Sequence, residues 1–386
     1  MSKRDVLLDV SRLIWRLWRG RLPTGVDRVC LAYLEHFRSR SRAVVQRRGR
    51  FFILDDRQSD RLFDLLAGGP EGFRVGFVRL ALRAFPFARA TPREKGPIYL
   101  NVGHTGLDEP SLGAWIARAG VRPIFLVHDL IPLLHPEFCR AGEQQKHRRR
   151  MINVLRNAAG IIGNSEATLR DLAAFAETQD LRMPPAIAAL IGGPPAPTEV
   201  APKHFDRPHF VTVGTIEGRK NHILLLNIWQ RMGAAGANDV PLLVIVGQRG
   251  WEAEAAIELL DGAGELRRHV IELGQCTDEE LAGIIAGARA LLMPSFAEGF
   301  GLPVIEALEL GTPVIASDLA VFREFAANIP HYVDSRDEAG WELAIRSFIE
   351  DTVERQRQLK RLAGFHPPDW STHFKKVDRW IETLSK

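Results

Sequence analysis

The segment "MPSFAEGFGLPVIEALELGTPVIAS" spans residues 293–317 and decides how the second half of the chain folds. It predicts a strand, a loop, a short helix with Pro303 in its first turn, and a new strand after Gly311. Glu298 lies just past the first strand, and Glu306 lies one turn into the helix. Two carboxylates so placed can hold hydroxyl groups several ångströms apart, with the helix N-terminus holding an anion between them. A nucleotide-sugar has this layout.

Short apolar runs alternate with amphipathic segments along the whole chain. The runs are nearly continuous in apolar residues, which is typical of parallel strands covered on both faces. Strands are expected within residues 5–11, 43–47, 97–103, 123–129, 160–165, 209–215, 241–247, 269–274, 288–295 and 312–317. The alternation predicts an α/β protein with two doubly wound, Rossmann-like domains facing a central cleft, where ligands bind at the carboxyl ends of the strands.

A segment rich in Pro and Gly at 191–208 lacks periodicity and is the best linker in the chain. We therefore expect a first domain at 1–198 and a second at 199–368. The tail, 369–386, is amphipathic and predicts a final helix.

The composition argues against several classes of protein. Hydrophobic residues make up 46% and charged residues 25%, the mix of a soluble globular protein. The three cysteines, Cys30, Cys139 and Cys276, lie far apart, which argues against a disulfide framework and a zinc site and fits a reducing compartment. No apolar run approaches the roughly 18 residues that span a bilayer. Acidic residues interrupt the first apolar stretch, so we expect no signal peptide.

The charge is distributed unevenly. Residues 1–200 hold 31 Lys and Arg against 20 Asp and Glu, a balance of +11, and the remainder holds 20 against 27, a balance of −7. This asymmetry indicates different partners for the two halves. The basic half suits nucleic acid, an acidic membrane or phosphates, or it is simply a solvated arginine-rich surface.

Two cations follow a predicted strand in "GTIEGRKNH" (214–222). Arg219 and Lys220, beside the free N–H groups of a helix start, suit a diphosphate, although two solvated bases would fit the same pattern. In "ELGQCTDEEL" (272–281) the backbone from Gln275 onward could form a pocket for a nucleobase, but helix capping alone explains its polar residues.

These motifs together resemble the retaining glycosyltransferases of family 4, which have the GT-B architecture. "EGFGLPVIE" is similar to the family's E-x7-E signature, and the motifs around it follow in the family's order over residues 209–325. In the more divergent first half, "FLVHDLIPLLHPEF" (125–138) and "IIGNSEATLRDL" (161–172) resemble two strand ends of the family. The resemblance implies an acceptor-binding first domain, a second domain that binds the nucleotide-sugar, and a last helix that crosses back to the first domain.

The resemblance also implies roles for single residues. Glu298 would contact the transferred sugar and Glu306 the ribose. Arg219 and Lys220 would neutralise the diphosphate. His128 would lie near the anomeric centre, although by itself it could equally be a buried core histidine. The implied catalytic set is Glu298, His128, Lys220 and Arg219, and the implied donor-binding set is Glu306, Gly299, Phe300, Gly301, Leu302, Gly25, Gly214, Thr215, Gly247, Gln275, Cys276 and Asp278.

The family chemistry implies transfer with retention, by attack on the face from which the phosphate departs. The chain has no Asp-x-Asp, so we expect neither a metal nor another cofactor. The chain departs from many family members in having Thr215 where they have arginine. GDP-mannose is the first guess for the donor, and a surface polysaccharide or lipopolysaccharide is the expected acceptor. We expect the Glu298→Gln variant to abolish transfer with little effect on folding. The alternatives are a GT-B sugar-nucleotide epimerase and a non-catalytic partner subunit.

Two segments of the first half interleave aromatic residues with arginines, at 13–25 and 72–90. They are compatible with a peripheral contact to an anionic membrane, with recognition of an acidic acceptor, or with amphipathic helices packed on the core. No partner nucleic acid is expected. The expected location is the cytoplasm, with peripheral attachment to the inner face of the cytoplasmic membrane.

Overall fold

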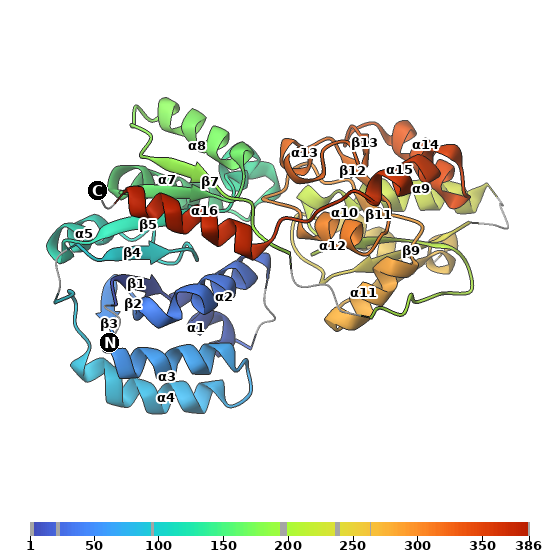
Figure 1. Ribbon diagram of the computed structural model, residues 1–386. Coiled ribbons are helices and arrows are strands. Elements are labelled where there is room, and N and C mark those ends of the chain that lie inside the picture. Colours follow the sequence, from blue (N-terminus) through green and yellow to red (C-terminus); the bar gives the residue numbers. More distant parts are fainter. Residues whose placement is uncertain are drawn as a thin grey trace. The chain divides into compact units, whose positions relative to one another are not determined.

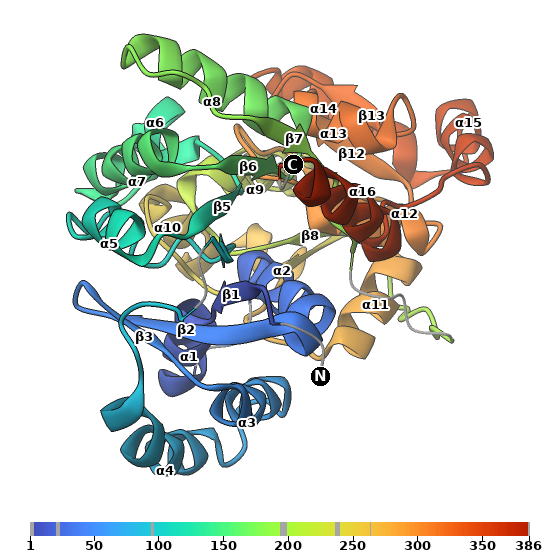
Figure 2. The same cartoon turned by 60° about the vertical axis from the view of Figure 1, so that its left-hand side comes forward.

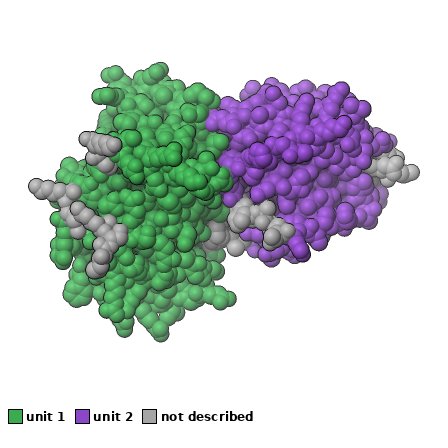
Figure 3. All heavy atoms as spheres, viewed as in Figure 1, with its two compact units in different colours: residues 1–130, 144–191, 369–386 green, residues 131–143, 192–368 purple. Residues whose placement is uncertain are grey.

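The computed structural model describes residues 4–20, 24–93, 96–193, 199–235, 240–262 and 264–384 (Figure 1). The chain divides into two compact units, coloured separately in Figure 3. Unit 1 comprises Met1–Leu130, Gln144–Ile191 and Asp369–Lys386, and unit 2 comprises Ile131–Glu143 and Gly192–Pro368. Each unit contains one twisted sheet covered by helices, as the alternation of apolar runs predicted.

Unit 1 is built on a sheet whose described strands have the order β3-β2-β1-β4-β5-β6-β7. All neighbours are parallel except β2 and β3, which pair as an antiparallel hairpin. The strands are β1 (Val6–Asp9), β2 (Ser41–Arg47), β3 (Arg50–Ile53), β4 (Ile98–Asn101), β5 (Arg122–Val127), β6 (Gly160–Gly163) and β7 (Ala186–Ala188). The α-helices are α1 (Ser11–Trp18), α2 (Gly25–Phe37), α3 (Asp56–Ala67), α4 (Phe73–Ala84), α5 (Leu112–Ala119), α7 (Glu143–Asn157), α8 (Glu166–Thr178) and α16 (Trp370–Thr383).

The final helix, α16, belongs to unit 1, as the resemblance implied. Asp369 caps its first turn by accepting a hydrogen bond from the backbone N–H of Thr372 at 2.9 Å. On its inner face His373 Nε2 lies 2.8 Å from the hydroxyl of Tyr33, and the ring of Phe374 stacks on His36 with 3.9 Å between centroids. Both partners lie on α2, so the last helix is held by specific contacts with one of the first.

Unit 2 repeats the architecture with the strand order β10-β9-β8-β11-β12-β13 among its described residues, all pairs parallel. The strands are β8 (His209–Val213), β9 (Leu242–Val246), β10 (Val270–Leu273), β11 (Leu291–Met293), β12 (Val314–Ser317) and β13 (His331–Val333). The α-helices are α6 (Ile131–Leu134), α9 (His222–Ala234), α10 (Glu254–Asp261), α11 (Asp278–Gly287), α12 (Leu302–Glu309), α13 (Ala320–Ala326), α14 (Glu338–Ile349) and α15 (Val353–Leu362).

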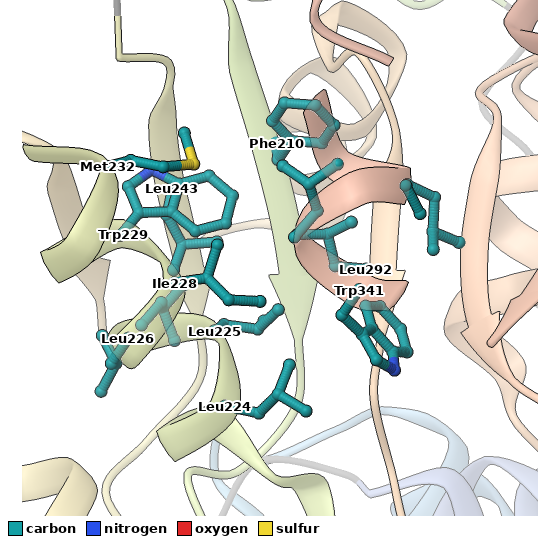
Figure 4. Close-up of a cluster of buried hydrophobic side chains, with 14 of the residues drawn as sticks. Phe210, Leu224, Leu225, Leu226, Ile228, Trp229, Met232, Leu243, Leu292 and Trp341 are labelled. Atoms are coloured by element: carbon teal, nitrogen blue, oxygen red, sulfur yellow. The ribbon is translucent and has the colours of Figure 1, made fainter. Parts of the chain in front are cut away.

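The core of unit 2 lies between α9 and the sheet (Figure 4). Trp229 and Leu225 of α9 pack with Phe210 of β8 and Leu243 of β9, and all four are completely buried. Complete burial of such a side chain contributes about 1.5–3 kcal/mol. The indole N–H of Trp229 donates to the carbonyl of Pro241 at 2.8 Å, so the polar group of this buried side chain is paired.

The structure departs from the sequence predictions in three short strands and one segment. The sequence did not predict β3, β7 and β13, because each has only three or four residues and mixes polar or small residues with apolar ones. Residues 131–143 lie in unit 2, although the expected first domain ran to 198. Phe138 explains this, since its ring stacks on Phe296 with 5.1 Å between centroids and its carbonyl accepts the indole N–H of Trp251 at 3.2 Å. The expected boundary at 198 itself lies outside the described residues.

None of the helices in the described part of the chain is both long enough and apolar enough to span a bilayer.

Candidate functional site

The site is built where two neighbouring strands of unit 2 end. In the sheet β8 lies beside β11, so the turn after β8 and the loop after β11 meet at the carboxyl edge. The turn continues into a short 3-10 helix, Gly218–Lys220, and the loop leads into α12. This arrangement brings the "GRK" cations to the first glutamate of the "EGFGLPVIE" segment, 78 residues later in the chain.

Glu298 is held by three side chains. Its Oε2 lies 2.8 Å from Nη1 of Arg219, and its Oε1 lies 2.6 Å from Nζ of Lys220 and accepts the hydroxyl of Ser295 at 2.6 Å. A second carboxylate, Glu217, lies 2.6 Å from Nε of Arg219. Two acids and two bases thus form a compact cluster with no net charge.

The cluster is buried, and burial opposes each of its charges. Burial raises the pKa of Glu298, but Lys220 and Arg219 outweigh it and lower that pKa from 4.5 to about 2. Burial lowers the pKa of Lys220, although Glu298 and Glu217 raise it. Burial raises the pKa of Glu217, although Arg219 and Lys220 lower it. The side chain of Glu298 is only 6% exposed, compared with 10% for Lys220 and 22% for Arg219. Arg219 is therefore the most accessible cation of the cluster.

The loop that carries Glu298 is fixed by backbone contacts. The N–H of Phe296 donates to the carbonyl of Arg219 at 2.8 Å. The amide of Asn221, a buried residue in the left-handed conformation (φ 56°), donates to the carbonyls of Pro294 and Ser335 at 3.3 and 3.0 Å. Asn221 therefore ties the end of β11 to the segment after β13.

Two predicted glycines are required by their surroundings. Gly301 has a φ of 103°, and a Cβ atom there would lie 2.3 Å from the ring of Phe322. At Gly247 a Cβ atom would lie 1.9 Å from the carbonyl oxygen of Gly214, which itself has a φ of 133°. The glycine at 247 is thus explained by the close approach of two turns, without reference to a ligand.

The other predicted donor-binding residues of unit 2 lie along the same edge of the sheet. Phe300 is buried, and Glu306 lies in α12. Three more residues, Gln275, Cys276 and Asp278, follow β10 at the start of α11. There Thr277 and Glu280 form a reciprocal capping box, which accounts for the polar residues of that segment.

Gly299 precedes α12 and Leu302 is its first residue, so both lie at the N-terminal end of the helix. Thr215 follows Gly214, and its methyl group packs close to Gly250.

Two predicted site residues lie in unit 1. His128 follows β5 and is buried, with Nε2 2.7 Å from the carbonyl of Val102 and its ring 5.0 Å from that of His104. Burial lowers the pKa of His128, so the ring is neutral at pH 7. Gly25 is the first residue of α2, whose capping box joins Thr24 and Asp27. These contacts describe well-packed residues, and the donor-binding roles of His128 and Gly25 stay predictions.

Three members of the site were not predicted from the sequence, namely Glu217, Ser295 and Asn221. Glu217 and Asn221 directly flank the "GRK" triplet, and Ser295 directly follows the strand end at Pro294. Polar residues that adjoin a charged motif were the only available signal, and such residues are common in exposed turns. Among the described residues no group of three or more His, Cys, Asp or Glu side chains is arranged to hold a metal ion.

Part of the chain is similar to a known protein family. Residues 199–363 match the family model of the glycosyl transferases group 1. The match covers less than half of the chain, and it shows that residues 199–363 are similar to this family. The matched segment includes the whole Glu298 cluster and all six strands of the described sheet of unit 2.

Curated proteins that are similar to this chain include mannosyltransferases. The chain is 29% identical over 247 residues to the serotype-specific mannosyltransferase WbdA of Escherichia coli, a match that covers 60% of this chain and 30% of WbdA. It is 33% identical over 144 residues to the O-antigen chain mannosyltransferase B of Escherichia coli, covering 37% of each protein. The chain thus spans about a third of the length of these curated relatives.

Solved structures share the complete two-unit fold. The Anabaena protein Alr3699/HepE in complex with UDP-glucose has a TM-score of 0.63 and 14% identity, covering 98% of this chain and 99% of HepE. Sucrose-phosphate synthase from Thermosynechococcus elongatus has a TM-score of 0.60 and 15% identity, covering 98% of both chains. The predicted GT-B fold of two Rossmann-like domains is confirmed.

Proposed function

We propose that this protein is a retaining, metal-independent glycosyltransferase, which moves a hexose from a nucleoside-diphosphate sugar to a growing surface glycan. The observation that supports this proposal is the buried Glu298–Arg219–Lys220 cluster, which lies just before α12 in the segment that matches the glycosyl transferases group 1. GDP-mannose is the first candidate donor, because two relatives of the chain are mannosyltransferases.

The two cations of the cluster, Arg219 and Lys220, can have different roles in donor binding. A donor diphosphate brings negative charge to a cluster that is already neutral, so it must compete for Arg219 or Lys220. Arg219 is the more exposed and is the only one of the two that can present a planar pair of N–H groups to phosphate. We therefore assign Arg219 to the diphosphate, together with the N–H groups at the start of α12, and Lys220 to holding Glu298 in place.

Glu298 is suited to binding sugar hydroxyls and is not suited to nucleophilic attack. Both of its carboxylate oxygens accept contacts, and its pKa of about 2 keeps it ionised. A nucleophile would have to leave these contacts to reach the anomeric carbon. In the proposed reaction the acceptor oxygen bonds to the anomeric carbon on the face from which the diphosphate leaves. The leaving phosphate oxygen takes the acceptor's proton, so the configuration is retained.

A screen of nucleotide-sugars tests this proposal. The full chain is titrated with GDP-mannose, UDP-glucose and UDP-N-acetylglucosamine in the presence of EDTA, and saturable binding and slow hydrolysis are measured. We expect saturable binding of one donor without metal, and about tenfold or more weaker binding by the Arg219→Ala variant. The Arg231→Ala variant is the control, because Arg231 lies in the last turn of α9 and pairs there with Glu338 and Glu342 of α14. Failure of the folded protein to bind any donor would refute the proposal, and conversion of the donor alone to an epimer would favour an epimerase.

Helix α4 supports a peripheral membrane contact as part of this function. Figures 1 and 2 show α3 between β2 and α4, so α4 is the outer helix of this edge of unit 1. The inner side of α4 buries Phe73, Phe77 and Leu80. Its outer side exposes Leu82 at 74%, and Phe87, just beyond the helix, is 83% exposed.

The outer side of α4 also exposes Val75 and Val78, so that apolar residues recur at helical spacing on a solvent-facing surface. Arginines at 74, 79 and 83 lie on the same helix. Exposed apolar side chains among arginines suit the interface of an anionic bilayer, where the acceptor would be lipid-linked.

Vesicle sedimentation tests the membrane contact. We expect the chain to sediment with phosphatidylglycerol vesicles and to remain in solution with phosphatidylcholine vesicles. The Leu82→Glu and Phe87→Glu substitutions should release it. The matched control is Leu343→Glu in unit 2, because Leu343 is 71% exposed but lies outside α4. Equal sedimentation of the Leu82 and control variants would refute the assignment of this surface.

A further inference from the structure

Two histidines at the carboxyl edge of the sheet of unit 1 are bound to each other's segments. β4 lies beside β5 in the sheet, and His104 follows the first strand as His128 follows the second. Nε2 of His104 lies 2.8 Å from the carbonyl oxygen of Leu126, and Nε2 of His128 lies 2.7 Å from the carbonyl oxygen of Val102. The centroids of the two rings are 5.0 Å apart. Each histidine is therefore tied to the segment that carries the other.

The loop that carries His104 is held in an unusual conformation. His104 has a φ of 59°, in the left-handed region that residues other than glycine rarely adopt. The loop is fixed on both sides of it. The carbonyl of Thr105 accepts hydrogen bonds from the side-chain amides of Asn101 and Gln46 at 3.1 and 3.2 Å, and the N–H of Gly103 donates to the side-chain oxygen of Asn101 at 3.2 Å. Strained residues that are held this firmly cluster at functional sites, so the conformation of His104 points to a role beyond packing.

The two hydrogen bonds determine which nitrogen of each ring carries the proton. A carbonyl oxygen can only accept, so Nε2 is the protonated nitrogen in both histidines. Burial lowers the pKa of His128 from 6.5 to about 4 and holds that of His104 well below its ordinary value, so both rings are neutral at pH 7. In a neutral ring with its proton on Nε2, the Nδ1 atom has a lone pair and can only accept a hydrogen bond.

The Nδ1 atom of His128 is available to a ligand. Within the described residues it makes no hydrogen bond, while the main chain of His128 is fixed, because its carbonyl accepts the side-chain amide N–H of Asn164 at 2.7 Å. An accepting nitrogen can pair with a hydroxyl group. It cannot pair with an oxygen of a diphosphate diester, which carries no proton to donate at pH 7. The chemistry of this atom therefore suits a sugar rather than a phosphate.

We propose that His104 is a positioning residue for the sugar transfer. It anchors the loop of Val102 to β5, the Val102 carbonyl holds His128 as the Nε2–H tautomer, and Nδ1 of His128 accepts a hydrogen bond from a sugar hydroxyl. This inference rests on the proposed function, because only a sugar transfer supplies a hydroxyl group for this atom. The hydroxyl belongs either to the donor sugar or to the acceptor glycan, and the same hydrogen bond recognises both.

Histidine tautomers measured by NMR test the positioning step without any substrate. Long-range ¹H–¹⁵N spectra of the full chain with ¹⁵N-labelled histidines show which ring nitrogen carries the proton, and a His128→Gln variant assigns the signals of His128. We expect the Nε2–H form of His128 in the parent chain and a mixture of both forms in the His104→Leu variant. His104→Gln should restore the parent signals, because its side-chain amide can donate to the carbonyl of Leu126 in place of Nε2. An Nδ1–H form of His128 in the parent chain overturns the proposal, even if the His104→Leu variant does not fold.

Binding measurements separate the sugar contact from a purely structural effect. GDP-mannose and GDP are compared on each variant, and α-linked mannotriose serves as a probe that resembles the acceptor. If the parent chain prefers another donor, that donor and its nucleoside diphosphate replace the pair. His104→Leu should weaken the binding of either GDP-mannose or the trisaccharide by about three- to tenfold, according to which hydroxyl His128 holds, and should leave GDP binding unchanged. His104→Gln should bind all three as the parent chain does.

His373→Leu is the matched control, because His373 is also buried in unit 1 and its Nδ1 lies 3.1 Å from the carbonyl oxygen of Leu190. It should leave the tautomer of His128 and the binding of each ligand as in the parent chain. Equal loss of GDP and GDP-mannose binding in the His104→Leu variant, or no loss for any ligand, would overturn the positioning role. Failure of the folded parent chain to bind any sugar ligand refutes the proposed function, whereas the wrong tautomer with intact donor binding overturns this inference alone.

Discussion

Replacing Glu298 by Gln should destabilise unit 2 by about 3 kcal/mol at neutral pH. Burial raises the pKa of Glu298, but Lys220 and Arg219 outweigh it and lower that pKa from 4.5 to about 2, and each pKa unit corresponds to about 1.4 kcal/mol. The side chain is almost fully buried, so solvent screens little of this interaction. The substitution also leaves Lys220 buried without its closest counter-charge, which costs several kcal/mol in comparable ion pairs. The sequence alone led us to expect little effect on folding, and the structure corrects that expectation.

Urea unfolding followed by hydrogen exchange measures this effect, because peptides from unit 2 report on that unit separately. Glu309→Gln is the matched control. Burial raises the pKa of Glu309, and no cation opposes that change, so its ionised form does not stabilise the fold. We expect the control to unfold like the parent chain or slightly later, and the Glu298 variant to unfold at clearly lower urea.

Two further measurements test the reasoning. The pKa of Glu298 is lower in the folded than in the unfolded chain, so its contribution is present above pH 4.5 and is lost as the pH falls toward 2. The difference between parent and variant should therefore be constant above about pH 5 and shrink below it. Adding Lys220→Met to Glu298→Gln should restore part of the lost stability, because both charges are then absent. If the Glu298 variant matches the parent within about 0.5 kcal/mol, the ion-pair argument is wrong.

Three other predictions follow from single contacts. Gly247→Ala should lower the free energy of unfolding of unit 2 by more than about 2 kcal/mol, because the new Cβ would lie 1.9 Å from the carbonyl oxygen of Gly214; unchanged thermal unfolding would contradict this. Tyr33→Phe should destabilise unit 1 by about 1–3 kcal/mol, since it removes the 2.8 Å hydrogen bond to His373 on α16, and urea unfolding measures the loss. Burial lowers the pKa of His222 from 6.5 to about 3, so the stability that depends on its neutral ring is fully present above pH 6.5. Below that value unit 2 should lose up to about 1.4 kcal/mol of its free energy of unfolding per pH unit. A His222→Leu variant with the same pH dependence would refute the assignment.

The "EGFGLPVIE" segment shows why part of the site could be predicted. Pro303 and Gly311 mark the limits of α12 through local conformational preferences, which act over a few residues, and the helix indeed spans Leu302–Glu309. The capping of α11 by Thr277 and Glu280 could be predicted from the sequence for the same reason. The short edge strand β13 could not be predicted, because its three residues form a strand through pairing with β12 and their own sequence pattern is too short to indicate one.

The sequence by itself determined ten of the thirteen described strands, where the glycine turns occur, and which residue types stand at the strand ends. These properties depend on hydrophobic periodicity and backbone preferences, both of which are local. Only the tertiary structure decided that Arg219 and Lys220 neutralise Glu298 across 78 or more residues, since that contact requires β8 to pair with β11. It also placed the 131–143 segment in unit 2, where the ring of Phe138 stacks on that of Phe296. Such contacts depend on the order of strands in the sheet. That order results from the packing of the whole unit, so local sequence patterns do not indicate which segments become neighbours.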